Sequence, residues 1–254
     1  MVFFGSRSSH PTAGTAMFLI TFVCFLYLGA AESPMAYKTI RVVNNCAFPV
    51  WPAIVGSTDL PPPQLRKLRA GESYSWKADP FWSGSVWGRT GCVFNSQGLG
   101  SCDSGDCGGN LQCEDDERTA DIMAITKAEF ELLGGIAKPD TYSVTLEKGY
   151  NLPMSVVPSY AANNISISRP CESMACTADA NAVCPKKLQE KKKGSVVTVC
   201  KGHYDGYLPR SPAFSKAFQK ACPRAFPYRS GTICPPSTAS YTLTFCPRRR
   251  RSSP

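Results

Sequence analysis

Cysteine is the residue type in this chain best suited to chemistry, because the sequence carries 13 of them among 254 residues. Thiols at this density either form disulfides or bind metal ions. Zinc sites usually combine C-x-x-C pairs with histidines, and the chain has no C-x-x-C and only two histidines. We therefore expect disulfides and no metal site. Cys24 lies in an apolar leader, and its removal with that leader would leave twelve thiols, an even number.

Other catalytic arrangements find little support in the sequence. His10 lies near the amino terminus, and His203 stands beside Tyr204 and Asp205 without a nucleophile motif. The glycine-rich stretches lie between cysteines and do not form a phosphate-binding loop. Asp106, among glycines, fits a turn residue that accepts hydrogen bonds from backbone amides better than a catalytic acid. We expect no cofactor.

The two ends of the chain carry processing and charge signals. Residues 1–36 hold an apolar run at 17–28 followed by small residues, which is the layout of a signal peptide. That run is shorter than the ~20 apolar residues of a membrane-spanning helix. Residues 248–254 form a basic tail, which with the lysines of 186–193 supplies most of the formal net charge of +9. No nucleic-acid motif accompanies this charge, so we expect no nucleic-acid partner.

Short β-branched and aromatic runs, separated by turns rich in glycine and proline, must position the candidate residues. The predicted strands are residues 39–43, 50–55, 73–76, 85–87, 142–146, 154–157, 196–199 and 241–245. This pattern predicts a β-sandwich or barrel. Helical periodicity is predicted only at 126–133 and 212–222. Two cysteine-rich segments, 90–120 and 171–222, predict excursions that disulfides hold together.

Several motifs in order along the chain resemble one known family. Residues 91–113 read GCVFNSQGLGSCDSGDCGGNLQC, which is similar to the signature of thaumatin-like proteins with Ser104 in place of the usual threonine. The other matching segments are VVNNCAFPVWPA (42–53), WSGSVWGRTGC (82–92), GYNLPMSVVP (149–158), SKAFQKACPRAFPY (215–228) and YTLTFCP (241–247). The sequence is therefore identified as a member of this family, with residues 37–247 as its domain.

The resemblance implies an all-β fold: a flattened antiparallel β-sandwich with two small disulfide-rich subdomains. It also implies a pairing of the twelve thiols. The pairs would be Cys46–Cys246, Cys92–Cys102, Cys107–Cys113, Cys171–Cys234, Cys176–Cys222 and Cys184–Cys200. Members of the family usually have sixteen cysteines. The four that are missing here belong to a loop after Cys200, so two whole bridges are absent and no odd thiol remains.

The resemblance further implies a cleft lined by one arginine, one glutamate and three aspartates. Only the glutamate is matched, by Glu129. Ser85 stands at the arginine position, Ser143 and Lys148 stand at two aspartate positions, and the third aspartate lies in a deleted stretch before Cys234. The charges of Glu129 and Lys148 cancel, whereas the set in the family is strongly negative.

These substitutions argue against hydrolysis of glycans. Cleavage of a glycosidic bond generally needs two carboxylates, and a lysine near Glu129 would favour the ionised form, which cannot donate a proton. Among other acids, Glu147 should point away from Lys148 on a strand, and Asp140 precedes that strand. The acidic run at 114–117 is either a solvated loop or a displaced acidic patch. We therefore expect no catalytic residues.

What remains is a binding protein. Phe81 and Trp82, in the turn PFWSG, are expected to be exposed aromatics that could stack on a sugar, with Arg89 as a further binding residue. The resemblance implies a secreted plant defence protein that binds fungal β-1,3-glucan or perturbs a membrane surface. A weak endo-β-1,3-glucanase and a diverged paralogue without antifungal action are the alternatives. We expect a monomer in the apoplast or vacuole, with a glycosylation acceptor at Asn164.

Overall fold

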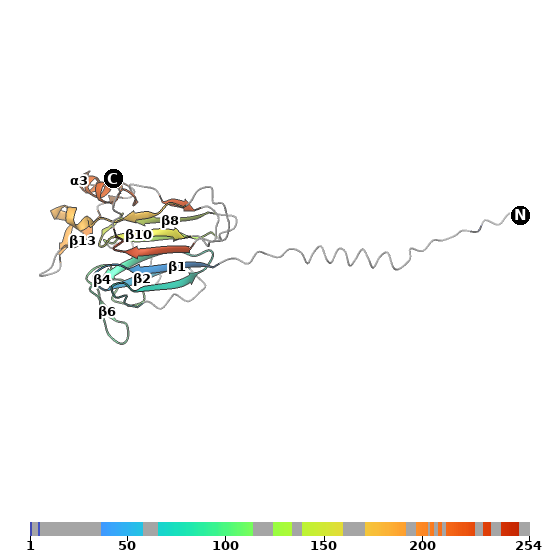
Figure 1. The fold of residues 1–254 in the computed structure, drawn as a ribbon, viewed down its shortest axis with the longest axis horizontal. Coiled ribbons are helices and arrows are strands. Elements are labelled where there is room, and N and C mark those ends of the chain that lie inside the picture. Colours follow the sequence, from blue (N-terminus) through green and yellow to red (C-terminus); the bar gives the residue numbers. More distant parts are fainter. Residues whose placement is uncertain are drawn as a thin grey trace. The chain divides into compact units, whose positions relative to one another are not determined.

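The structure is a computed structural model, and the chain divides into two units, Met1–Pro34 and Met35–Pro254. It describes residues 1, 5, 37–57, 66–113, 124–133, 139–159, 171–191, 197–202, 204–205, 208–209, 212–226, 231–234 and 240–248. Every helix and strand among the described residues belongs to the second unit (Figure 1). The leader, the acidic run at 114–117, Asn164, His203 and the tail beyond Arg248 lie outside the described residues.

Two five-stranded sheets form the body of this unit. The first has the order β11 (Met174–Cys176), β10 (Met154–Ser159), β17 (Ser240–Phe245), β1 (Lys38–Asn44) and β3 (Ser73–Ala78). The second has the order β16 (Thr232–Cys234), β8 (Asp140–Thr145), β7 (Lys127–Glu131), β4 (Ser83–Thr90) and β2 (Val50–Ser57). Buried and less buried residues alternate along β1 and β17, as expected for strands with one face on a core. The all-β sandwich predicted from the sequence is therefore confirmed.

Nearly all strand pairs are antiparallel, with one informative exception. β1 and β17 run parallel, with Ile40 opposite Tyr241 and Asn44 opposite Phe245. Parallel strands need a long connection, and here almost the whole domain lies between the two. The disulfide between Cys46 and Cys246 follows directly after both strands. The two ends of the domain are thus held together at the centre of one sheet.

The core lies between the two sheets and contains a chain of aromatic rings. Trp82 lies 5.9 Å from Phe130 between ring centroids, and Phe130 lies 5.6 Å from Tyr241. Tyr241 in turn packs edge-on against Tyr142 at 5.1 Å. These rings come from β7, β8, β17 and the turn before β4, so aromatic contacts join both sheets.

A buried ion pair also joins the sheets. Lys38 of β1 pairs with Asp140 of β8, and the two side chains are only 2% and 1% exposed. The hydroxyl of Tyr241 donates to Asp140 Oδ2 at 2.5 Å, and the amide of Leu133 donates to Oδ1 at 3.2 Å. A buried carboxylate needs such partners, because it has lost its hydration. Asp140, weighed from the sequence as a substitute acid, is therefore part of the core.

One predicted helix is wrong. Residues 126–133 contain strand β7, in which Ala128 and Phe130 are buried while Lys127, Glu129 and Glu131 are not. Period-two burial fits a strand between β4 and β8, and this tertiary pairing overrides the weak helical spacing. The second predicted helix is present as α3 (Pro212–Ala221).

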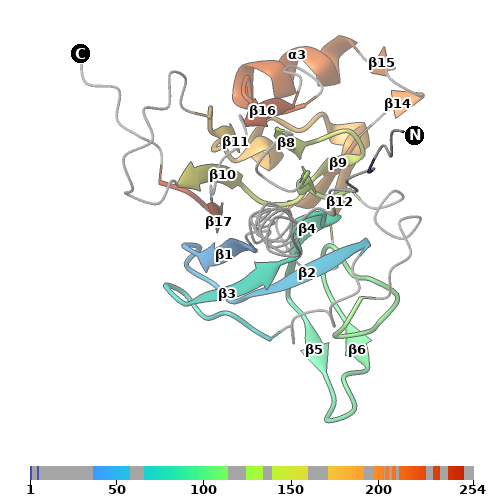
Figure 2. The same ribbon diagram turned by 90° about the vertical axis from the view of Figure 1, so that its right-hand side faces the viewer.

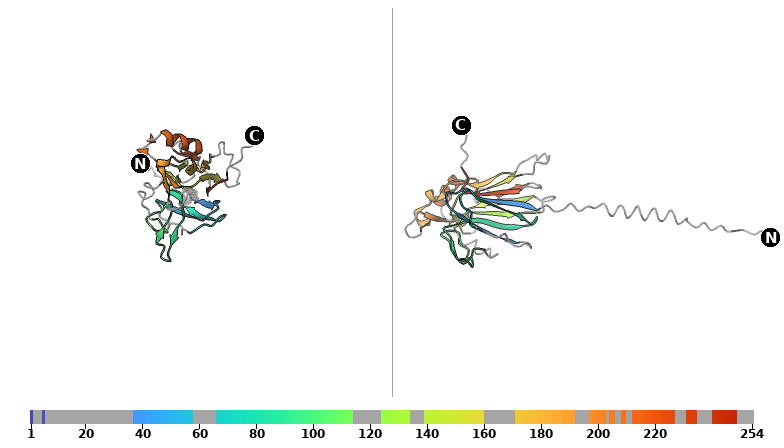
Figure 3. Two further views of the ribbon diagram at one scale, coloured as in Figure 1. Left: turned by 90° about the vertical axis from the view of Figure 1, so that its left-hand side faces the viewer. Right: turned by 60° about the horizontal axis from the view of Figure 1, so that its bottom comes forward.

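Smaller elements lie at opposite sides of the sheets. The hairpin of β5 (Val93–Phe94) and β6 (Gly100–Ser101) projects on one side, and α3 lies on the other (Figures 2 and 3). With α3 lie β14 (Tyr204–Asp205) and β15 (Leu208–Pro209). The remaining elements are a three-stranded sheet of β12 (Gln189–Lys191), β13 (Val197–Lys201) and β9 (Gly149–Tyr150), and the 3-10 helices η1 (Ala180–Val183) and η2 (Lys186–Leu188).

Six disulfides stabilise the domain. They join Cys46 with Cys246, Cys92 with Cys102, Cys107 with Cys113, Cys171 with Cys234, Cys176 with Cys222, and Cys184 with Cys200. These are the six pairs that the resemblance implies. All twelve cysteines beyond the leader are used, so none of them is left as a free thiol.

Candidate functional site

Three of the predicted cleft positions form one row across neighbouring strands. Glu129 of β7 lies opposite Ser85 of β4 on one side and Ser143 of β8 on the other. Their neighbours Val86, Ala128 and Val144 are fully buried, so the three side chains point to the outer face of the sheet. We call Ser85, Glu129 and Ser143 the Glu129 row.

Glu129 is half-exposed and already has partners on this face of the sheet. Its Oε1 lies 2.9 Å from Nζ of Lys127, and its side chain is 45% exposed. The hydroxyl of Ser143 donates a long hydrogen bond of 3.4 Å to Oε2. Lys127 stands two residues before Glu129 on β7, which places both side chains on the same face. Sequence reasoning missed Lys127, although this two-residue spacing could have identified it once the segment was read as a strand.

The expected role of Lys148 needs correction. β8 ends at Thr145, so Glu147 and Lys148 lie in the turn that follows and do not alternate as strand residues. Instead of pointing apart, they approach each other, with 3.9 Å between Nζ and Oε1 of Glu147. The cation that balances Glu129 is therefore Lys127.

A second carboxylate shares this outer face. Glu131 is two residues beyond Glu129 on β7 and is exposed. It lies opposite Ser83 and Thr141, and the Thr141 hydroxyl donates to Glu131 Oε2 at 3.2 Å. The sequence reasoning overlooked Glu131 because it assigned a helix here. In a strand, Glu129 and Glu131 point in the same direction.

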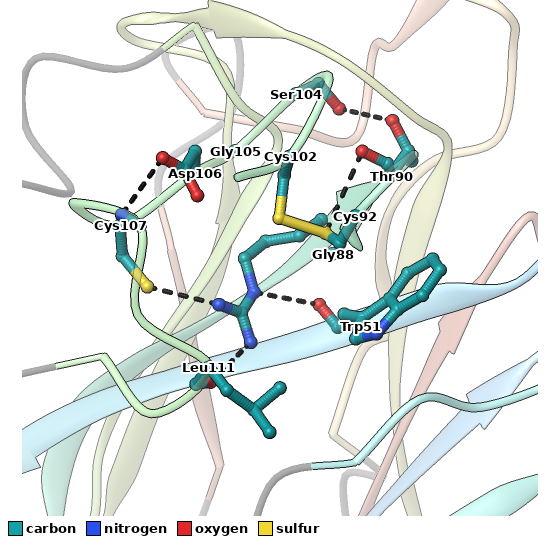
Figure 4. Close-up of a disulfide and its surroundings, with 12 residues drawn as sticks. Trp51, Gly88, Thr90, Cys92, Cys102, Ser104, Gly105, Asp106, Cys107 and Leu111 are labelled. Atoms are coloured by element: carbon teal, nitrogen blue, oxygen red, sulfur yellow. Dashed lines mark hydrogen bonds between the residues drawn. A yellow bond between two sulfur atoms is a disulfide. The ribbon is translucent and has the colours of Figure 1, made fainter. Parts of the chain in front are cut away.

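Arg89 lies on the same face of β4, but it is completely buried. The loop of residues 105–113 covers it, and its guanidinium donates to backbone carbonyls of this loop and of β2. Figure 4 labels Trp51 and Leu111, two of the residues whose carbonyls accept these bonds. The bonds run to Trp51 at 3.3 Å, Pro52 at 3.1 Å, Asn110 at 2.7 Å and Leu111 at 2.7 Å, with a further contact of 3.2 Å to Cys107 Sγ. The predicted binding role of Arg89 is wrong, because no ligand can reach a side chain used in this way.

The charge of Arg89 is retained despite burial. Loss of hydration lowers its pKa to about 10, and the nearby carboxylate of Asp106 acts in the opposite direction. Asp106 Oδ2 accepts a hydrogen bond of 3.1 Å from the Gly109 amide, as expected for a turn residue. Its Oδ1 is buried and has no hydrogen-bond partner among the residues that the structure describes. Arg89 and Asp106 therefore organise the signature loop and belong to its structure.

Ser104, the residue that departs from the family signature, has a structural role as well. Its hydroxyl lies 2.7 Å from the Thr90 hydroxyl and accepts 3.1 Å from the side-chain amide of Asn151. Asn151 also donates to the Gly88 carbonyl at 2.8 Å. A hydroxyl is what this position requires, and serine supplies it. Gly91 and Gly105, on either side, have positive φ values of 61° and 71°, which glycine adopts without strain.

The two predicted aromatic binding residues have opposite surroundings. Phe81 is 55% exposed, whereas Trp82 is only 4% exposed. The Trp82 ring packs between Trp76 and Phe130 and lies so close to Gly84 that an added Cβ would approach it to 2.5 Å. Trp82 was therefore wrongly predicted as exposed. Phe81 remains available, held in its turn by a hydrogen bond of 2.8 Å from its amide to Asp79 Oδ1.

Metal sites and membrane-spanning helices are the two remaining features to consider. Within the ranges given above, no group of three or more histidine, cysteine, aspartate or glutamate side chains could hold a metal ion. In that same part of the chain, no helix has the length and apolar character needed to cross a membrane.

Comparison with protein families matches residues 44–247 to the Thaumatin family. The chain belongs to this family. A thaumatin-like protein from Arabidopsis thaliana is 34% identical over 261 residues, covering 94% of this chain and 99% of that protein. A glucan endo-1,3-beta-glucosidase from Prunus avium is 32% identical, covering 82% and 90%. Among solved structures, a thaumatin-like xylanase inhibitor matches 82% of this chain and 99% of that one, with 24% identity and a TM-score of 0.47.

Pathogenesis-related proteins also occur among the relatives. The pathogenesis-related thaumatin-like protein 3.5 of Cryptomeria japonica is 32% identical and covers 90% of this chain. The pathogenesis-related protein 5 of Arabidopsis thaliana is 33% identical over the same share. The Glu129 row therefore belongs to a thaumatin family protein whose relatives include pathogenesis-related proteins.

Proposed function

We propose that this thaumatin family member is a secreted defence protein that binds fungal β-1,3-glucan on the outer face of the sheet β16-β8-β7-β4-β2 without hydrolysing it. The Glu129 row, with Lys127 and Thr141, offers hydroxyl, carboxylate and ammonium groups that can hydrogen-bond to sugar hydroxyls. Phe81 is exposed in the turn that precedes β4, two residues before Ser83, so its ring is available near the start of that strand. Sugar rings pack their apolar faces against such aromatics.

The contact between Lys127 and Glu129 carries the non-catalytic part of the proposal. A general acid must release its own proton to the glycosidic oxygen from a free carboxyl group. Oε1 of Glu129 lies 2.9 Å from the Lys127 ammonium, and Oε2 faces the Ser143 hydroxyl at 3.4 Å. Both oxygens are thus engaged as acceptors. A serine, and not a second carboxylate, flanks Glu129 on each side of its row.

Three separate observations support the proposed secretion and defence role. The leader has the pattern of a signal peptide. Six disulfides that use every cysteine after the leader suit an oxidising compartment. Relatives named as pathogenesis-related match most of the chain. An extracellular defence protein fits all three.

Binding is tested by pull-down on insoluble β-1,3-glucan with two phenylalanine variants. Phe81→Ala should weaken retention about three- to tenfold, because a ring stacked on a sugar contributes on the order of 1 kcal/mol. Phe48→Ala is the matched control, since Phe48 is 46% exposed and precedes β2 at the end of the sheet where Val50 pairs with Thr90, whereas Phe81 precedes β4 at the end where Ser83 pairs with Ser57. Equal retention of wild type and both variants would contradict the assigned surface, and no retention of wild type would contradict glucan binding.

A weak endo-β-1,3-glucanase is the second candidate, and Glu131 favours it. Two residues along a strand span about 6.6 Å, which lies within the separation of roughly 6.5 to 9.5 Å between the carboxyl groups of inverting glycosidases. Glu129 and Glu131 share the outer face, and one relative is named a glucan endo-1,3-beta-glucosidase. Release of reducing sugar that is abolished by Glu131→Gln would establish this alternative.

A diverged paralogue without antifungal action is the remaining alternative. It predicts neither retention on glucan nor release of reducing sugar. Growth inhibition of a glucan-walled fungus by the purified protein would exclude it, and the Phe81→Ala variant would show whether inhibition depends on the proposed face.

A further inference from the structure

A groove of about 650 Å³ lies on the outer face of the other sheet, away from the Glu129 row. Its floor comes from β10 and β11, whose Met154, Val156 and Met174 point into the core while Ser155 and Val157 point outward. The last turn of α3 and the residues after it form one wall, and the residues after β17 form another. We call this the Lys220 groove. Its volume would hold a small oligosaccharide.

The charges that line the groove all have the same sign. Its charged and hydroxyl-bearing lining residues are Lys220, Arg224, Arg248, Ser155, Ser173 and Thr177. Among the described residues, the lining contains three cations and no carboxylate. Within the described part of the chain, no acidic side chain pairs with Lys220 or Arg248. Three uncompensated cations around one hollow favour an anion.

Two features show that the groove is built and is not only a charged surface. Arg224 is oriented by hydrogen bonds from Nη2 to both the carbonyl and the hydroxyl of Ser173, while its own carbonyl accepts 3.0 Å from the Ala175 amide. The disulfide between Cys176 and Cys222 ties β11 to the end of α3. The floor and the wall that carries Lys220 and Arg224 are therefore fixed relative to each other.

Ser155 supplies a hydroxyl on the floor of the groove, where the residue as a whole is only 7% exposed. A serine hydroxyl can both donate and accept a hydrogen bond, so it suits a ligand oxygen. Arg224, on the wall, offers the planar donor geometry that matches a carboxylate.

From these features we propose that the Lys220 groove binds an acidic oligosaccharide through the carboxylates of its uronic-acid units. Cations on separate walls suit a ligand with repeated negative charges, and the hydroxyls of Ser155, Ser173 and Thr177 suit sugar hydroxyls. A membrane surface fits less well, because peripheral binding also needs large apolar side chains to enter the lipid, and the lining offers Val157 and small residues instead. The proposal does not depend on glucan binding, which uses the other sheet.

Calorimetric titration of the secreted protein with a hexamer of galacturonic acid tests the proposal, with the fully methyl-esterified hexamer as the uncharged control. The acidic hexamer should bind and the ester should not. Raising the salt from 50 to 500 mM should weaken binding at least about tenfold, because partly exposed charges are screened. Absence of binding to the acidic hexamer, or equal binding of the ester, would overturn the proposal.

A charge-matched pair of variants locates the site. Lys220→Gln with Arg248→Gln should weaken binding about tenfold or more, whereas Lys67→Gln with Lys77→Gln should change it less than about twofold, since exposed charges distant from a ligand contribute little. Lys67 and Lys77 are exposed and do not line the groove. Equal losses in the two double variants would show binding to net charge alone and would overturn the site.

Two further experiments distinguish the groove from the basic tail and an acidic oligosaccharide from a lipid headgroup. A chain ending at Arg248 removes the last three arginines of the tail, and it should keep most of the binding. Loss of binding on this truncation, with retention in the Lys220→Gln/Arg248→Gln variant, would assign binding to the tail and overturn the groove. Sedimentation with vesicles of phosphatidylcholine and phosphatidylserine should show no uptake that the acidic hexamer displaces. Displaceable uptake of the vesicles would favour a lipid headgroup in its place.

Discussion

Arg89 and Glu129 point outward from the same sheet, and a comparison of their two regions shows how a loop divides one face. Arg89, on β4, lies beneath the signature loop and is fully buried. Glu129, on the neighbouring β7, has no such cover, and its side chain is 45% exposed. Both were candidate site residues in the sequence. The disulfide-held loop turns one end of the face into an interior and leaves the other end open to ligands.

The two regions also handle charge differently. The buried guanidinium is satisfied by backbone carbonyls, which carry no net charge, and Asp106 lies close enough to influence its pKa. The exposed carboxylate is balanced by one lysine, with a separation of 2.9 Å. Burial makes every partner of Arg89 necessary, whereas water can replace the partners of Glu129. Substitutions should therefore have unequal effects on stability.

The largest effect is expected at Arg89. Arg89→Ala should lower the free energy of unfolding by about 3 to 5 kcal/mol, because it leaves several buried carbonyls without donors and opens a cavity. Urea denaturation measures the change. Arg41→Ala is the control, since Arg41 is exposed and its guanidinium donates a hydrogen bond of 3.1 Å to the Ser73 hydroxyl at the surface. A change at Arg89 as small as that at Arg41 would show that the loop does not depend on its buried cation.

An intermediate effect is expected from the bridge that holds the covering loop. Replacing Cys107 and Cys113 together by serine opens a ring with a sequence separation of 6. The loss should be about 2 kcal/mol, because a short loop constrains the unfolded chain only modestly. Thermal unfolding and limited proteolysis near residue 110 measure it. A loss as large as that caused by Arg89→Ala would contradict this ranking and would show that the bridge stabilises the loop as much as the guanidinium does.

The smallest effect on stability is expected at the open end of the face. Lys127→Gln should change the free energy of unfolding by less than about 1 kcal/mol, as for other partly exposed ion pairs. Glu129→Gln should behave in the same way. Denaturation of the single and double variants in a mutant cycle measures the pairwise contribution. A coupling energy well above about 1 kcal/mol would mean that the Glu129 row is a structural element like the Arg89 region.

The sequence predicted most strands of the two sheets. It did not predict that one end of the outer face, at Arg89, is buried while the other end, at Glu129, is open. Alternating β-branched runs located β1, β2, β10 and β17, because each places one face on the core. The stretch at 126–133 was misread as helix, since its alternation becomes decisive only between β4 and β8. That error hid Lys127 and Glu131.

Burial of individual side chains was harder to predict than strands. Phe81 and Trp82 are neighbours in one turn, and composition gives no sign that one ring is exposed and the other buried. Arg89 looked like a cleft residue because the loop that covers it is polar and rich in glycine. In both cases the deciding contacts come from segments distant in the sequence. A polar loop can bury a charge when its backbone carbonyls converge on it.

One assay tests the central proposal most directly: incubation of the protein with insoluble β-1,3-glucan, followed by measurement of both bound protein and released reducing sugar. Wild type, Glu129→Gln and Glu190→Gln are compared, since Glu190 is another exposed glutamate paired with a lysine, Lys201. We predict retention of wild type and Glu190→Gln, weaker retention of Glu129→Gln, and no sugar above background for any of them. Reducing sugar released by wild type and lost in Glu129→Gln would contradict binding without hydrolysis.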